Sequence, residues 1–218
     1  MEMVASHPRI KARRAIAFLT MVAFAALLAA AEEGRSERES DALLPFQSQF
    51  LGTSLFVLTS LIPNSGSFFA VLDYGIRLGA KDSLLLGADV WKYSSPMGNP
   101  WSSEVSYPGS VLSYGVIAGY QRFLWKGLYA SLLFNALAMD YSDSAGQRVG
   151  SGFQLMTTLR AGYHFEFSLF DQSCYFEPGG ELNWWPLNLG VPAAFSSIDA
   201  AYPNYVFSPA LNVGVYIR

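Results

Sequence analysis

His164 and Glu166 are the residues of this chain whose types and spacing come closest to a catalytic pair. A histidine that a carboxylate holds in place can take a proton from a serine hydroxyl, as in enzymes that transfer acyl groups. On an extended segment the two side chains share one face, because they are two residues apart. No serine has a matching register, since Ser168 is in phase but falls in an expected turn. The sequence therefore favours a structural histidine and predicts no enzyme activity.

Other ionisable residues recur on one face of extended segments whose opposite face is apolar. Over residues 68–80, Asp73 and Arg77 alternate with apolar neighbours such as Leu72 and Ile76. Side chains alternate across a strand, so a closed sheet with this pattern would be apolar outside and polar inside. We predict an interior polar network made by Asp73, Arg77, Asp89, Arg160, His164, Glu166, Glu177 and Glu181.

The charges of this network do not balance, because five acids face two arginines and one histidine. Buried charges persist when they are paired and hydrogen-bonded. Our hypothesis is that protonated carboxyls, interior water or a bound cation relieves the excess. We expect Asp73, Asp89, Arg160 and Glu181 near mid-height, and Arg77, His164, Glu166 and Glu177 nearer one end.

The elements that would position these residues are eight strands, each near or above the length of a tilted membrane strand. We expect them over residues 48–61, 67–80, 84–93, 110–123, 128–140, 153–167, 175–185 and 205–217. Short connections alternate with longer ones at 94–109, 141–152 and 186–204, and 63–66 is the one short member of the second set. Residues 128–139 are also compatible with a helix. Pro209 requires a bulge or an unpaired position in the last strand.

Aromatic residues gather near both ends of the expected strands. Amphipathic rings prefer the interface between membrane and water, so we expect two aromatic girdles. Their members would be Trp91, Tyr93, Trp125, Tyr163, Trp184 and Trp185.

In this architecture the chain resembles the small eight-stranded bacterial outer-membrane barrels, the group that includes the membrane domain of OmpA, OmpX and OmpW. The resemblance covers residues 46–218 and implies an all-β, eight-stranded antiparallel up-and-down transmembrane β-barrel in the outer membrane. It implies contact with membrane lipids, with lipopolysaccharide or its equivalent, and with the outer-membrane assembly machinery. Eight strands leave an interior just wide enough for side chains, so we expect a plugged polar lumen.

The first 45 residues differ in composition from the rest. Residues 1–31 combine a basic start with an apolar run and three alanines before Glu32, which is typical of a secretory signal peptide. Residues 32–45 are charged without apolar periodicity, which predicts a flexible lead-in. The signal contains four of the fourteen basic residues and one of the seventeen acidic ones, so the mature chain has a net charge of −6. An acidic chain disfavours nucleic-acid binding.

The sequence favours a structural or surface-interaction role, with a possible ligand of loops 94–109 and 186–204. The alternative is a narrow, porin-like channel or carrier for small hydrophobic or ionic solutes. A lipid-modifying enzyme ranks third, because known barrel enzymes of that kind work near the outer leaflet and His164 falls near the periplasm. We expect no cofactor, and one cysteine, Cys174, makes a cysteine-based metal cluster impossible.

Overall fold

The computed structural model describes residues 49–61, 67–96 and 106–217. Its strands are β1 (Gln49–Ser54), β2 (Phe68–Arg77), β3 (Asp82–Tyr93), β4 (Gly109–Trp125), β5 (Leu128–Asp143), β6 (Arg148–Tyr163), β7 (Phe165–Leu169), β8 (Gln172–Leu189) and β9 (Tyr205–Ile217). A 3-10 helix, η1 (Leu55–Leu61), follows β1, and a helix, α2 (Ala193–Asp199), precedes β9. The predicted signal peptide and lead-in lie outside the described residues. Within those residues, no helix combines the length and the apolar character needed to cross a membrane.

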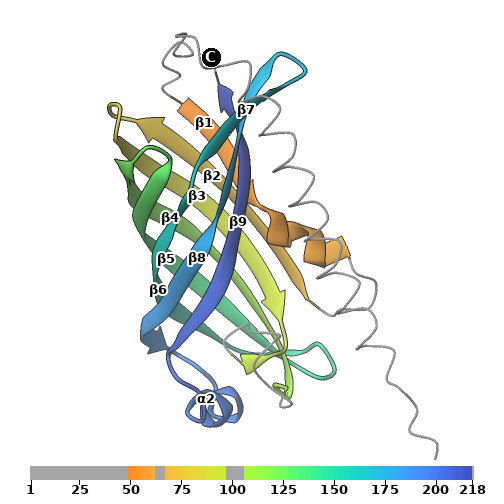
Figure 1. Cartoon of the computed structure of the whole chain (residues 1–218). Helices are drawn as coiled ribbons and strands as arrows, with labels where there is room; N and C mark the ends of the chain where they lie inside the picture. Colours follow the sequence, from red (N-terminus) through yellow and green to blue (C-terminus); the bar gives the residue numbers. More distant parts are fainter. Residues whose placement is uncertain (1–48, 62–66, 97–105, 218) are drawn as a thin grey trace, which may run out of the picture. The chain divides into compact units, whose positions relative to one another are not determined.

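The strands form one closed antiparallel β-barrel (Figure 1). Each strand pairs with its neighbours in the sequence, and pairing of β1 with β9 closes the circle. β6 and β7 follow each other along β8 in the same register, interrupted at His164, so they count as one strand of the wall. The predicted eight-stranded up-and-down architecture is therefore confirmed.

The β2–β3, β4–β5 and β7–β8 turns lie at the same end of the barrel as the C-terminal end of β9, which we call the turn end (Figure 1). The connection that carries α2 lies at the opposite end, the loop end. This alternation follows from up-and-down topology, in which successive connections join strands at opposite ends. Residues 128–143 form a strand, β5, along their whole length, so the helical alternative for this segment is wrong.

Two expected boundaries need correction. The strand expected over 48–61 ends at Ser54, where the Ser54 hydroxyl accepts a hydrogen bond from Phe56 N and the chain continues as η1. The long loop expected over 141–152 is a tight hairpin, because Asp143 Oδ1 accepts hydrogen bonds from Ala145 N and Gln147 N. Gly146 has φ +80° there, a conformation that glycine adopts without strain.

Two prolines sit where strand pairing is interrupted. Pro186 lies in a bulge of β8, since Trp184 and Leu187 pair with Thr157 and Leu155 of β6 with one extra residue between them. Pro209 of β9 lies beyond Asn212, the last residue that β1 reaches, so no described strand pairs with that edge. Proline has no N–H to contribute to a ladder, which explains both positions.

Candidate functional site

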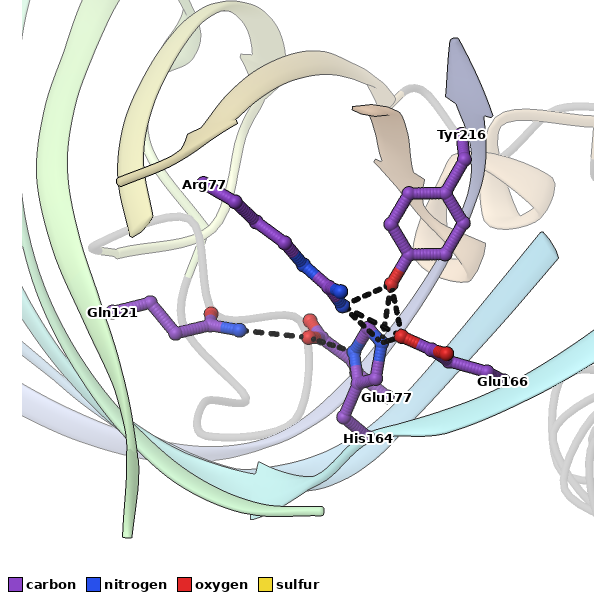
Figure 2. A network of polar contacts seen from close by, with 6 residues as sticks. All are labelled: Arg77, Gln121, His164, Glu166, Glu177 and Tyr216. Atoms are coloured by element: carbon purple, nitrogen blue, oxygen red, sulfur yellow. Dashed lines mark hydrogen bonds and ion pairs between the residues drawn. The ribbon is translucent and has the colours of Figure 1, made fainter. Parts of the chain in front are cut away.

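Six polar residues meet inside the turn end of the barrel, and we call them the turn-end cluster: Arg77, Gln121, His164, Glu166, Glu177 and Tyr216 (Figure 2). They come from β2, β4, β7, β8, β9 and the residue between β6 and β7. β4 does not pair with β8, yet Gln121 Nε2 donates to Glu177 Oε1 at 2.9 Å. These contacts therefore cross the interior and join opposite parts of the wall.

Glu166 is the acceptor at the centre of this cluster. Its Oε1 accepts hydrogen bonds from Arg77 Nη2 at 2.6 Å and from the Tyr216 hydroxyl at 2.6 Å. Arg77 Nη2 also donates to the Tyr216 hydroxyl. Charge-assisted bonds of this kind are about twice as strong as neutral ones.

His164 lies between the two carboxylates of the cluster. Its Nδ1 is 2.7 Å from Glu177 Oε1, and its Nε2 is 2.8 Å from the Tyr216 hydroxyl and 3.2 Å from Glu166 Oε1. A ring that carries protons on both nitrogens can donate at each of these positions. In that protonation state Arg77 and His164 would balance Glu166 and Glu177, and the cluster would carry no net charge.

Aromatic rings fix the two cationic side chains. His164 stacks on Tyr175 with a centroid distance of 5.1 Å, and the Arg77 guanidinium lies 4.8 Å from the centre of the Tyr216 ring. Phe50, Leu85 and Leu133 form one buried apolar cluster with both tyrosines. Both ring nitrogens of His164 lie within hydrogen-bond distance of acidic or phenolic groups. Ser168, which was expected in a turn, lies in β7.

A second polar group lies around the Arg160–Glu181 pair. These residues occupy paired positions on β6 and β8, with Nε 3.1 Å from Oε2. Glu181 Oε1 also accepts from Asn183 Nδ2 at 3.1 Å and from Ser208 Oγ at 3.2 Å. Every oxygen of the carboxylate therefore has a partner.

Asp89 belongs to a third polar contact, with Asn135. Asn135 Nδ2 donates to Asp89 Oδ2 at 2.7 Å, although β3 and β5 are separated by β4. Asp73 lies within the electrostatic range of Arg160, Glu177, Asp89 and Glu181. The structure thus divides the eight predicted residues into the turn-end cluster and these further groups.

Several partners were missed by a prediction that considered ionisable residues alone. Gln121, Asn135, Asn183 and Tyr216 each contact one of the predicted carboxylates. Strand alternation could have found them, because Gln121 and Asn135 face inward among apolar residues. Uncharged polar side chains on an interior face are as informative as charged ones.

The prediction of an aromatic girdle is wrong in its placement of Trp91, Tyr93 and Trp185. Tyr93 is 6% exposed, Trp91 packs against it with ring centroids 4.9 Å apart, and Trp185 is buried. Trp91 and Tyr93 are an even number of residues from Asp89 along their strand, and Trp185 is an even number from Glu181. Positions related in this way, which we call positions of the same parity, face the same side of a strand, so alternation directs all three rings inward. Trp125 and Trp184 are exposed, and Tyr163 is half-buried.

The interior of the loop end is apolar and includes Phe195 of α2. Phe195 of α2 is 1% exposed, and its ring lies 5.1 Å from that of Tyr107 and 5.0 Å from that of Tyr141. Val111, Leu137, Met139 and Tyr93 complete this loop-end core. α2 therefore packs against the loop end of the barrel through Phe195, its one buried residue.

Asp199, the last residue of α2, should make the docking of this helix sensitive to pH. The Tyr107 hydroxyl donates to its carboxylate, but burial outweighs this bond and raises the pKa of Asp199 above its ordinary value of 3.8. A raised pKa means that the folded state favours the protonated acid. Docking should therefore be stronger below the raised pKa and weaker as pH rises through it.

We expect proteolysis of residues 193–204 to slow as pH is lowered toward 3.8. The Asp199→Asn variant should lose this dependence, because its side chain does not ionise. The measurement is the rate of cleavage by an acid-tolerant protease, corrected with an unrelated substrate at each pH. Equal pH dependence in both proteins would contradict the role of Asp199.

Among the described residues, no group of three His, Cys, Asp or Glu is arranged to hold a metal ion. Cys174 is a buried free thiol in β8. Comparison with family models, with curated proteins and with solved structures finds no match for this chain. A function for this chain must therefore be inferred from its fold and from the contacts inside the barrel.

Proposed function

We propose that the chain is a bacterial outer-membrane β-barrel with a plugged polar lumen and a structural or surface-interaction role. The observation that carries this proposal is the sorting of side chains between the two faces of the wall. Large apolar residues on the outer face are exposed in β2, β3, β4, β5 and β6, namely Leu72, Leu86, Val116, Phe134 and Leu159. Val116 is 65% exposed. Soluble proteins rarely expose so continuous an apolar surface, whereas lipid covers it without cost.

The contents of the interior support a lumen that passes little solute. The turn-end cluster spans the barrel from β2 to β7 and from β4 to β8, and Phe195 packs into the loop-end core. Eight-stranded barrels have room for side chains and little more. In this proposal the small barrels of the OmpA, OmpX and OmpW group are the architectural counterparts.

The loop end is the proposed contact surface. α2 keeps Phe195 inward, and its exposed residues Ala193, Ala194, Ser196 and Ser197 are then available to a ligand or envelope partner. Lipopolysaccharide or its equivalent would contact the outer wall near this end, and the assembly machinery would act during insertion. No catalytic role is included in the proposal.

Spin labels at neighbouring positions of β2 test the membrane orientation. A label at Leu72 should report hydrocarbon, and one at Asp73 should report a polar, protected surrounding. The folded protein should also fractionate with outer membranes and migrate faster on a gel before boiling than after. A water-exposed environment at Leu72, together with solubility in the absence of detergent, would reject the proposal in favour of a periplasmic barrel.

The second candidate is a carrier for small hydrophobic solutes, and an interruption of the wall favours it. β1 pairs with β2 only from Gln49 to Gly52 and with β9 only from Gln49 to Ser54. Beyond this point side-chain hydroxyls replace the ladder: Ser60 bonds to both N and O of Phe69, and Thr53 donates to Val71 O at 2.6 Å. Phe207 on the facing edge is 74% exposed.

Cross-linking distinguishes the two candidates. A disulfide between cysteines introduced in η1 and in the facing part of β9 would close the interrupted stretch. A carrier should lose uptake of a fluorescent apolar solute into vesicles and regain it on reduction. A structural barrel should give no uptake in any state and almost no current in planar bilayers.

A further inference from the structure

Asp73 and Asp89 are interior carboxylates without an ion-pair partner in the described part of the chain. Arg77, His164 and Arg160 form their ion pairs with Glu166, Glu177 and Glu181. Arg160 is the cation with the largest electrostatic effect on Asp73, but its Nε is bound to Glu181. Two negative charges in the barrel interior are therefore left without a dedicated counter-charge.

These two carboxylates lie close together on neighbouring strands. Asp73 of β2 pairs with Gly87 of β3, which is two residues from Asp89 on the same inward face. Diagonal neighbours of this kind are within reach of each other across a strand pair. Like charges in such positions repel unless a cation or a proton lies between them.

An acceptor without a donor lies beside them. Asn135 is 2% exposed, and its Oδ1 has no hydrogen-bond partner among the described residues. Asp89 Oδ1 is likewise buried without a partner there, while Asp89 Oδ2 accepts from Asn135 Nδ2. Buried acceptors that lack a donor are energetically costly, so such atoms are usually bound to water or an ion.

Two glycines provide the space that these oxygens occupy. Asp73 Oδ1 would lie 2.5 Å from a Cβ atom on Gly87, and Asn135 Oδ1 would lie 2.8 Å from one on Gly115. Gly115 pairs with Asp89, and Asn135 reaches across it from β5. Side-chain oxygens from β2 and β5 thus lie over Gly87 of β3 and Gly115 of β4, and Asp89 is the strand partner of Gly115.

We propose that Asp73, Asp89 and the side-chain oxygen of Asn135 bind one calcium ion inside the barrel. An all-oxygen set with two carboxylates suits a hard divalent cation, and its charge cancels both acids. Ca²⁺ accepts irregular sets of six to eight oxygens, and water supplies the remaining ligands. Mg²⁺ demands a near-ideal octahedron, which a set drawn from three strands of a fixed wall does not adapt to readily.

Calcium should raise the heat-unfolding midpoint of the full chain folded in detergent. Half of the shift should occur at about 10⁻⁴–10⁻³ M, the range of extracellular calcium sites. The variants Asp73→Asn and Asp89→Asn should lose the shift, and in chelator they should be at least as stable as the unmodified chain, because the repulsion is gone. The control Asp82→Asn, which alters the exposed pair with Arg122, should keep the full shift.

Terbium luminescence supplies a second measurement, which uses the unmodified chain and does not depend on folding of the two Asn variants. Trp91 is two residues from Asp89 on the same face and should transfer excitation to bound Tb³⁺. The expected result is one Tb³⁺ per chain, displaced by calcium and weakened by Trp91→Phe. The proposal is overturned if calcium leaves the midpoint unchanged, or if both Asn variants keep the shift, which would indicate binding elsewhere. Stabilisation by acid alone, without a calcium effect, would also overturn it in favour of shared protons or water.

Discussion

The Glu177→Ala variant should lose about 3–5 kcal/mol of unfolding free energy, the range observed when one partner of a buried ion pair is removed. Glu177 is 5% exposed and accepts hydrogen bonds from His164 and Gln121. Its removal leaves the Nδ1 side of His164 and the Gln121 amide without an acceptor, inside a region closed by Tyr175 and Phe123. Water has little access to this region, so it cannot readily replace the lost hydrogen bonds.

Urea unfolding of the barrel in lipid vesicles, followed by tryptophan fluorescence, measures this effect. The control is Asp82→Ala, which removes the carboxylate of the exposed pair with Arg122 and should change stability little. The double variant Glu177→Ala with His164→Phe should recover part of the loss, because no polar ring remains. Similar unfolding curves for Glu177→Ala and Asp82→Ala would show that the turn-end cluster is accessible to water.

Arg160→Ala should destabilise the barrel by about 3–5 kcal/mol as well, for a different geometric reason. Glu181 keeps its neutral partners Asn183 and Ser208 in this variant but loses its cation. Asp73 loses the same positive charge. The variant thus leaves an unpaired carboxylate at mid-height and strengthens the negative field around Asp73 and Asp89.

Removing Glu181 together with Arg160 separates charge from packing. If the loss comes from an unpaired carboxylate, Arg160→Ala with Glu181→Ala should be more stable than Arg160→Ala alone. Arg148→Ala is the matched control, because Arg148 pairs with Asp140 at an exposed position. An unchanged heat-unfolding profile for Arg160→Ala would reject an energetic role for this pair.

Alternation of side chains allowed the wall and most of its interior to be predicted from the sequence. Asp73, Arg77 and Glu177 lie on the strand face that also carries glycines and other polar residues. The opposite face of these strands is apolar throughout, so the polar face must point inward. The rule is reliable here because a shift of one residue would place every charge on the apolar outer face. What alternation cannot give is the partner of each side chain across the interior, such as Gln121 for Glu177.

The aromatic predictions failed where closeness to a strand end was given more weight than parity. Tyr93 and Trp185 stand near the loop end, as interfacial residues would, but they have the parity of Asp89 and Glu181. Inside a narrow barrel, large rings fill volume as effectively as they cover an interface. The residue type alone does not tell whether a ring fills the interior or covers the interface, whereas its position in the alternation along the strand does.

Side-chain hydroxyls and carboxylates explain the misplaced boundaries. Ser54 and Thr59 form local hydrogen bonds that turn the chain into η1, although its apolar residues suit a strand. Asp143 organises the hairpin that had been expected to be a long loop. Such bonds compete with strand pairing, and apolar patterns do not record them.

β1 is joined to its neighbours by fewer backbone pairs than any other strand of the wall, with β6 and β7 counted as one strand. It makes four residue pairs with β2 and six with β9, whereas β5 and β6 share fifteen. Local opening begins where the fewest hydrogen bonds must break. The pairing of β1 with β2 and β9 should therefore be the first to exchange its amide hydrogens and the last to form during folding. The final joining of the first and last strands would then set the pace at which the cylinder assembles.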